Sequence, residues 1–301
     1  MSLLVVGSVA FDSIRTPHGE VDGILGGSAT FFSVAASWFG PVKVVAVVGD
    51  DFGEEHLEVF RLRSIETSGL EHAPGKTFRW HGEYLGDMNE ARTLAVHLNV
   101  FEKFSPKIPP SHVSSEFVFL GNIDPRLQLH VRRQLPGARL VACDSMNYWI
   151  EGSLGQLKET LTAVDALVIN EGEARMLSGR QNLRQAAAEI QKLGPRIVVI
   201  KRGEYGVALF NNGSIFSAPA FMLEHFKDPT GAGDTFAGGF MGHLAKSGDF
   251  SEGNLRRAVA YGSVMASFAV EEFGLKRLLA LTPQAIEARM SEFMRLTQLD
   301  V

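Results

Sequence analysis

The sequence contains almost no cysteine, because Cys143 is the only one among its 301 residues. An intrachain disulfide is therefore excluded, and the chain suits the reducing conditions of the cytoplasm. A cysteine-based metal site is excluded for the same reason. The nine histidines are scattered, and no two have the spacing of a zinc-binding pair on one helix.

An excess of positive charge and long apolar runs are also missing. The formal net charge is −5, whereas binding to a nucleic-acid backbone requires a basic surface. No apolar run approaches the roughly 18 residues of a membrane helix, and residues 1–7 lack the basic start and long apolar core of a signal peptide. We therefore expect a soluble, cytoplasmic protein with neither nucleic acid nor membrane as a partner.

Short apolar runs rich in β-branched residues alternate with helical patterns along most of the chain. Such near-continuous apolar runs favour strands that are buried on both faces. The expected strands are Leu3–Val6, Val42–Val48, Phe117–Leu120, Leu140–Cys143, Ala166–Ile169 and Ile197–Ile200. The expected helices are Ala29–Trp38, Glu54–Ser64, Leu127–Gln134, Ser153–Ala163, Glu171–Leu177, Leu183–Leu193, Leu255–Phe268 and Pro283–Leu296. This alternation predicts a three-layer α/β/α sandwich with a mostly parallel central sheet.

Two segments interrupt this alternation. Ser13–Leu25 is polar and glycine-containing, and Lys76–Val100 holds two runs of alternating polar and apolar residues, Thr77–Leu85 and Thr93–Val100. Such alternation is typical of antiparallel strands with one side facing solvent. We expect residues 13–25 and 76–100, approximately, to form a small β-sheet inserted in a single α/β domain that spans residues 1–301.

The most informative stretch runs from Asp228 to Phe240. Its three small residues, Gly231, Ala232 and Gly233, precede Asp234, and an apolar helix follows. Backbone at such residues approaches a ligand closely, and the free N–H groups at a helix start favour an anion. An acid beside an anion site suits a base that takes a proton from a hydroxyl attacking a bound phosphoryl group. The alternative is a glycine-rich turn with Asp234 as the helix cap.

This stretch resembles the C-terminal signature of the ribokinase-like (PfkB) family of carbohydrate kinases. Five further segments resemble that family's motifs in the family's order: Val5–Asp12, Leu25–Ala29, Val47–Gly53, Asn170–Glu173 and Lys201–Gly206. The resemblance covers essentially the whole chain. It implies a ribokinase-like fold in which the inserted β-segments form a lid. It also implies transfer of the γ-phosphate of ATP to a substrate hydroxyl, with Mg²⁺ as cofactor.

The resemblance further implies a role for individual residues. Asp234 would be the catalytic base, and the N–H groups from Gly231 through Ala232 and Gly233 to Asp234 would form an anion hole. Substrate would be bound by Asp12 and by the backbone of Gly26 and Gly27. The ATP side would comprise Asn170, Glu173, Gly203 and Gly206, with Glu173 acting on Mg²⁺ through water. Some family members bind K⁺ or another monovalent cation, for which Asp228 and Thr230 are the candidate ligands.

Each of these roles has a structural alternative. Asp12 could be a turn residue after a strand, and Gly26 and Gly27 could form a plain loop before a helix. The pair Asn170 and Glu173 also fits a capping box at a helix start. Gly203 and Gly206 also fit an ordinary hairpin.

A few positions depart from the family pattern or extend it. Phe31 stands where many sugar kinases have asparagine, so it either makes the substrate site more apolar or packs inside a helix. Lys201 replaces a small hydroxyl residue and would either bind a phosphate of ATP or be solvated. Asn122 follows a predicted strand and is either a substrate contact or a turn residue. Asp144 and Asn147 follow the next strand and are similar candidates.

We therefore expect an ATP-dependent phosphotransferase that acts on a hydroxyl of a sugar or sugar-like polyol. A nucleoside kinase on the same scaffold is the alternative, and a non-catalytic ligand-binding homologue is a third. The expected partners are ATP and a small molecule, and the chain would be a monomer or a homodimer formed through the lid. A dinucleotide oxidoreductase is excluded because residues 7–12 contain no G-x-G-x-x-G turn after the first strand.

Overall fold

A large, mostly parallel sheet forms the centre of the molecule. Within the residues that the computed structural model describes (1–86, 88–89 and 91–298), this sheet has nine strands in the order β13-β12-β11-β10-β9-β8-β1-β4-β5. From β11 to β5 the neighbours all pair in parallel, whereas β12 and β13 add an antiparallel edge. The strands are β1 (Leu3–Val6), β4 (Val42–Val48), β5 (Glu66–His72), β8 (Phe117–Leu120), β9 (Leu140–Cys143), β10 (Ala166–Asn170), β11 (Ile197–Lys201), β12 (Val207–Asn211) and β13 (Ser214–Ala218).

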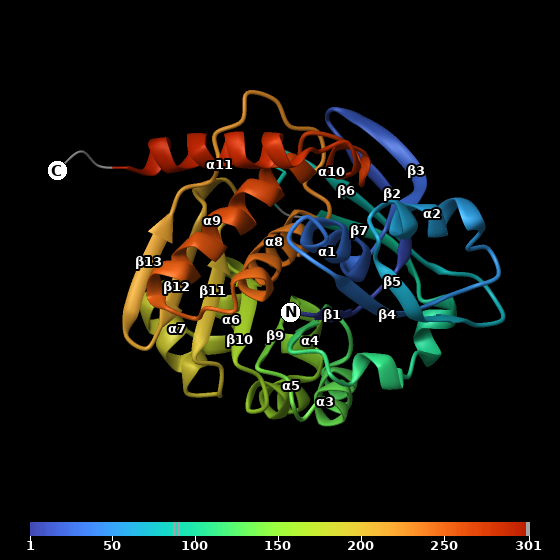
Figure 1. Cartoon of the computed structure of the whole chain (residues 1–301), viewed down its shortest axis with the longest axis horizontal. Helices are drawn as coiled ribbons and strands as arrows, with labels where there is room; N and C mark the ends of the chain where they lie inside the picture. The colour runs from blue at the N-terminus through green and yellow to red at the C-terminus, as the bar shows by residue number, and fades with distance from the viewer. Residues whose placement is uncertain (87, 90, 299–301) are drawn as a thin grey trace.

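Helices cover both faces of this sheet, as Figure 1 shows. One layer consists of α1 (Ser28–Ala36), α2 (Glu54–Leu62), α8 (Ala232–Ser247), α9 (Glu252–Ala269), α10 (Lys276–Leu279) and α11 (Pro283–Thr297). The other consists of α3 (Pro125–Gln134), α4 (Asn147–Gly152), α5 (Leu154–Leu161), α6 (Glu171–Ser178) and α7 (Leu183–Gln191). Successive residues of a strand enter opposite cores, as Val5 and Val6 do in β1. Near-continuous apolar runs are therefore what each central strand requires.

A second, smaller sheet has the strand order β3-β2-β6-β7 and is called the lid below. Its strands are β2 (Ala10–Thr16), β3 (Gly19–Gly26), β6 (Phe78–Tyr84) and β7 (Ala91–His97). Strands β2 and β6 pair in parallel, with Asp12 opposite Trp80. The lid has a small apolar core of its own, formed by Ile14, Tyr84 and Met88. Short 3₁₀ helices occur at Asn99–Lys103, Pro110–His112 and Gly203–Tyr205.

The structure confirms the predicted three-layer architecture and the small β lid. All six predicted strands form, and the predicted helices end within a few residues of the expected positions. The alternating runs in 76–100 become β6 and β7, while Asp87 and Glu90 of the joining segment lie outside the described residues. In the described part of the chain, no helix is both long and apolar enough to span a membrane.

The motif Val5–Asp12, which resembles the family's first strand with an acid at its end, is divided between two sheets. Strand β1 ends at Val6, as predicted, whereas Asp12 belongs to β2 of the lid and is not a turn residue. The chain leaves the central sheet at Gly7, where a Cβ atom would lie 2.7 Å from the Ser28 hydroxyl. Asp12 is therefore a lid residue, which matters for how a substrate would reach it.

Candidate active site

The start of helix α8 is the centre of the site. Gly231 is the N-cap and has φ 73°, a left-handed conformation that glycine adopts without strain. A Cβ atom there would overlap the ring of Phe31, which packs directly against this turn. Among the described residues, no side chain caps α8. The Ala232 N–H donates to the Pro229 carbonyl at 3.1 Å, so the N–H groups left for a ligand are those of the neighbouring Gly231 and Gly233. With their dipole, they make a ready anion site.

Asp234 lies in the first turn of α8, two residues after its first residue, Ala232. The alternative in which Asp234 is the N-cap therefore does not hold, since Gly231 takes that position. Burial raises the pKa of Asp234 to about 6, and the positive charge of Lys201 acts in the opposite direction. The carboxylate is thus poised to exchange a proton near neutral pH.

Lys201, the last residue of β11, reaches the same turn. A Cβ atom at Gly233 would lie 2.7 Å from Lys201 Nζ, so the ammonium group is adjacent to the backbone of the Gly231–Gly233 turn. Its charge also lowers the pKa of Asp144 and Glu173, which burial raises. Lys201 therefore lies among the acids at the start of α8, while its phosphate-binding role stays a prediction.

Asp144 directly follows β9, and its carboxyl group is buried without a full set of hydrogen bonds. Its side chain is 8% exposed, and Oδ1 has no hydrogen-bond partner among the described residues. Burial is the main cause of its strongly raised pKa, and the negative charges of Asp234 and Glu173 add to it. Asp144, Glu173 and Asp234 therefore surround Lys201 with more negative charge than one lysine balances. Asn147 starts α4 nearby, and its Oδ1 accepts the Tyr148 N–H.

The predicted ATP-binding residues lie at the ends of β10 and β11. Asn170 and Glu173 form the expected capping box of α6, because the Glu173 N–H donates to Asn170 Oδ1 and the Asn170 N–H donates to Glu173 Oε2, both at 2.8 Å. Gly203 (φ 55°) and Gly206 (φ 90°) shape the 3₁₀ turn between β11 and β12. Both local expectations hold, while the nucleotide-binding role stays a prediction.

Asp12 approaches the site from the lid side. It is 5% exposed, and burial raises its pKa to about 7, against the lowering effect of the hydrogen bond from the Gly27 backbone. The charges of Asp228 and Asp234 raise this pKa further. A Cβ atom at Gly26 would overlap the Asp12 carboxylate, so the first glycine of the pair makes room for the acid. The structure thus brings Asp12 toward Asp234.

Asp228 and Thr230, the candidate cation ligands, hold the turn that precedes α8. Asp228 is fully buried, and its two oxygens accept the N–H groups of Thr230 (2.9 Å) and Gly274 (3.3 Å). The Thr230 hydroxyl donates to the phenolic oxygen of Tyr84 in the lid at 3.3 Å. In the described part of the chain, no group of three or more His, Cys, Asp and Glu side chains is arranged to hold a metal.

Two predicted substrate contacts have other partners in the structure. Phe31 is 1% exposed and lies under Gly231, which matches the packing alternative. Asn122 is engaged by neighbours, because Trp149 Nε1 donates to its Oδ1 at 2.9 Å and its Nδ2 contacts Met146 Sδ at 3.0 Å. Phe31 therefore packs behind the turn, while the substrate contact expected of Asn122 stays a prediction.

Sequence reasoning missed Trp80 and Tyr84, which share one face of lid strand β6. Asp12 pairs with Trp80 across β2 and β6, so their side chains emerge on the same face. The Trp80 ring covers Gly82, where a Cβ atom would overlap it. In the sequence, the alternation of polar and apolar residues over Thr77–Leu85 indicated a strand with two different faces. It could not show which face lies toward α8.

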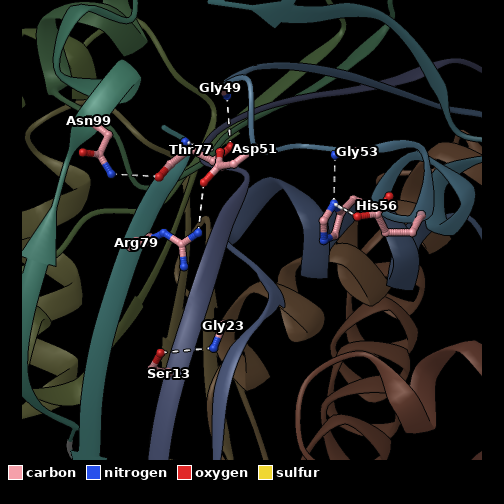
Figure 2. A network of polar contacts seen from close by, with 10 residues as sticks. Ser13, Gly23, Gly49, Asp51, Gly53, His56, Thr77, Arg79 and Asn99 are labelled. Atoms are coloured by element: carbon pink, nitrogen blue, oxygen red, sulfur yellow. Dashed lines mark hydrogen bonds and ion pairs between the residues drawn. The ribbon is translucent and has the colours of Figure 1, made fainter. Parts of the chain in front are cut away.

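The lid is anchored at its base by the segment after β4, as Figure 2 shows. Asp51 accepts the Thr77 N–H at 2.7 Å and the Arg79 guanidinium at 2.9 Å. The Gly49 N–H donates to the Thr77 hydroxyl at 3.0 Å, and Asn99 Nδ2 donates to the Thr77 carbonyl at 2.9 Å. These bonds fix the start of β6 to the segment that follows β4. Gly49 and Asp51 of the Val47–Gly53 motif thus hold the lid in place.

Comparison with known proteins places this geometry in context. A family model described as pfkB family carbohydrate kinase matches residues 2–280. Cytidine kinase of Thermococcus kodakarensis is 30% identical over 259 residues, which are 84% of this chain and 91% of that protein. The crystal structure of a putative ribokinase II from E. coli in complex with ATP and Mg²⁺ matches with a TM-score of 0.79 at 17% identity, covering 97% of this chain and 99% of that one. Adenosine kinase from Sinorhizobium meliloti matches with a TM-score of 0.81 at 18% identity, over 96% and 99% of the two chains.

Proposed function

The chain belongs to the pfkB family of carbohydrate kinases, and from this premise we propose that it transfers the γ-phosphoryl group of ATP to a hydroxyl of a sugar or sugar-like polyol. One observation carries the proposal: Asp234, Lys201 and the Gly231–Gly233 turn meet at the start of α8. An ionised acid, a fixed cation and open backbone N–H groups are the three parts that in-line phosphoryl transfer requires.

In this mechanism Asp234 accepts the proton of the attacking hydroxyl. A pKa of about 6 leaves it mostly ionised at neutral pH yet basic enough to take the proton. The N–H groups of Gly231 and Gly233 and the ammonium of Lys201 then stabilise the charge of the transferring phosphoryl group, while the Ala232 N–H stays bonded to the Pro229 carbonyl. Asp12 and the backbone of Gly26 and Gly27 hold the substrate from the lid side.

The acids of the site fit a divalent cation brought in with ATP. Asp144, with its unpartnered Oδ1, and Glu173 leave negative charge beside Lys201 that such an ion would neutralise. Asn170 and Glu173 would hold Mg²⁺ and the phosphates largely through water. When bound, Mg²⁺ neutralises phosphate charge during transfer. A monovalent cation beside the turn would be bound by Asp228 and Thr230.

A nucleoside is the second candidate substrate, and Trp80 favours it. Its partly buried indole lies on the face of the lid that carries Asp12, the predicted ligand of the sugar hydroxyls. A planar base next to a ribose bound by Asp12 would have an aromatic ring to stack on. The similarity to a cytidine kinase supports the same substrate class.

A substrate panel scored by ADP production tests both candidates. Ribose, an inositol and cytidine would each be offered with Mg-ATP, and we expect ADP with at least one of them. The Asp234→Asn variant controls for contaminating kinases and should lower turnover by roughly 10² to 10⁴ with an unchanged unfolding midpoint. Turnover near that of the wild type would remove Asp234 from the mechanism. No ADP with any substrate would favour a non-catalytic ligand-binding protein.

A further inference from the structure

The lid touches the turn before α8 directly, through one hydrogen bond. Tyr84 is the last residue of β6 and is 8% exposed. Its phenolic oxygen accepts the Thr230 hydroxyl at 3.3 Å, while the Thr230 N–H donates to Asp228 Oδ1 at 2.9 Å. Thr230 is thus held from both sides, and the next residue, Gly231, is the N-cap of α8.

A second connection runs through the loop that follows α9. Phe273 packs into the lid core against Ile14, Tyr84 and Met88. The next residue, Gly274, donates its N–H to Asp228 Oδ2 at 3.3 Å. The lid core therefore contacts both ends of the short network that positions the turn: the hydroxyl of Thr230 and, through the Phe273 loop, the carboxylate of Asp228.

We infer that the lid completes the anion site as well as covering it, with Tyr84 as a positioning residue for the Gly231–Gly233 turn. The inference rests on the proposed phosphoryl transfer. Two of the three residues of this turn are glycines, which are free to adopt many backbone conformations. Backbone N–H groups stabilise a developing charge only when they are fixed before the reaction. Without the Tyr84 bond, Thr230 would be held only through Asp228, and the turn would be less well fixed.

Burial and charge keep the Tyr84 phenol suited to this structural task. Its pKa is raised by burial and by the carboxylates of Asp228, Asp12 and Asp234 that face it. A phenol is neutral in the physiological range even without this shift, so Tyr84 adds no charge beside the catalytic acid. Tyr84 acts on the reaction through Thr230, without contact to the phosphoryl group.

Replacing Tyr84 by phenylalanine isolates this bond, because the ring that fills the lid core is retained. The matched control is Tyr261→Phe, which removes another hydroxyl hydrogen bond, from Tyr261 to Glu287 Oε1 at 3.2 Å between α9 and α11. We expect Tyr84→Phe to lower kcat about five- to tenfold, in line with one lost hydrogen bond, and to change KM for ATP less than twofold. Amide exchange of a peptide covering Gly231–Asp234 should accelerate in Tyr84→Phe and stay unchanged in Tyr261→Phe.

The two readouts separate this inference from the proposed function. Wild-type protein that forms no ADP would remove the function, while the exchange measurement would still decide whether the lid fixes the turn. Wild-type exchange rates together with a kcat within twofold in Tyr84→Phe would overturn the inference. A raised KM for the substrate with unchanged kcat would also overturn it, because Tyr84 would then be a binding contact.

Discussion

At the scale of single residues, the site is governed by an imbalance of charge. Lys201 lowers the pKa of Asp144, Glu173 and Asp234, while burial raises the pKa of all three. Burial is the largest effect on each acid, so the lysine moderates the rise without cancelling it. The pKa of Asp234 consequently depends on a residue more than thirty positions away, and no local motif reveals this coupling.

The pH dependence of the rate tests this coupling. We predict that kcat/KM falls as the pH drops through about 6, because Asp234 must be ionised to accept a proton. Asp12 titrates close by, at about 7, but among the described residues the charges acting on it are those of Asp228 and Asp234. Of Asp12 and Asp234, only Asp234 has its pKa lowered by Lys201, so Lys201→Met should shift the fall in rate at acid pH to a higher pH.

A matched control for that experiment lies on the same helix. Lys246→Met removes an exposed lysine from the last turn of α8, far from the acid at its start, and should leave the pH–rate profile in place. If Lys201→Met also leaves the limb where it is, the limb belongs to Asp12 or to another group, and the coupling between Lys201 and Asp234 is absent.

Residues whose partners are close in sequence could be predicted, whereas those with distant partners could not. The capping box of Asn170 and Glu173 spans three positions, so its spacing alone predicts both hydrogen bonds. Phe31 packs on Gly231, two hundred residues later, and Asn122, in the loop after β8, bonds to Trp149 of α4. Their positions in the sequence do not reveal these contacts, so the sequence left open whether either residue faces substrate.

At the scale of elements, the site depends on how closely helices α1 and α8 approach. A Cβ atom at Gly238 of α8 would lie 2.5 Å from the Phe32 carbonyl of α1, so small residues allow the two backbones to pack together. This packing places Phe31 under the turn that begins α8. The glycines after Asp234 thus allow α8 to pack closely on a neighbouring helix. The glycines before Asp234 form the turn where the ligand would bind.

Gly231→Ala is predicted to damage both stability and activity. An alanine at φ 73° costs roughly 1 to 2 kcal/mol for the left-handed backbone alone, and its Cβ would also overlap the Phe31 ring. Chemical denaturation would measure the loss. Gly155→Ala, at an open position of α5, is the control and should not destabilise the protein. Measured in a Phe31→Leu background, Gly231→Ala should cost less unfolding free energy, because the overlap with the ring is relieved. If Gly231→Ala then costs no unfolding free energy at all, the left-handed backbone contributes nothing to the loss.

The predicted elements were those with strong, uniform patterns. Buried strands such as β1, β8 and β9 are continuous apolar runs, so their residues suffice to locate them. Strands β5 and β13 at the two edges of the large sheet were missed, because one face of each is exposed and their sequences contain many polar residues. Strand β12 was missed as well, although it is a buried, mostly apolar run. Helix α4 has only six residues, too few for a helical period to stand out.

At the scale of the whole molecule, the lid and the body share residues without forming one continuous core. Phe273 of the body packs into the lid core, and Asp51 of the body anchors the start of β6. Between strand β3 and the segment 272–279 lies a mainly apolar cavity of about 370 Å³, which Ile24 and Phe273 help to line. The lid and the body are thus not in continuous contact here, while Phe273 and the base of β6 keep the lid attached.

We predict that the lid unfolds locally before the body does. The packing of Phe273 should determine most of the free energy of this local unfolding. A sheet of four short strands with a core this small is only marginally stable without the body. Phe273→Ala removes the body's contribution to that core, so amide exchange in β2, β3 and β6 should accelerate about tenfold or more while exchange in β8 and β9 stays unchanged. The thermal midpoint of the body should move by no more than a few degrees.

The comparison of Phe273→Ala with Phe221→Ala decides whether the effect is confined to the lid. Phe221 is a partly buried aromatic that packs against the main core beside Phe293, remote from the lid core. Its loss should lower the global midpoint without selective exchange in β2, β3 and β6. If Phe273→Ala instead speeds exchange in body and lid alike, the two form one cooperative unit, and a lid that opens separately could not control the turn at the start of α8.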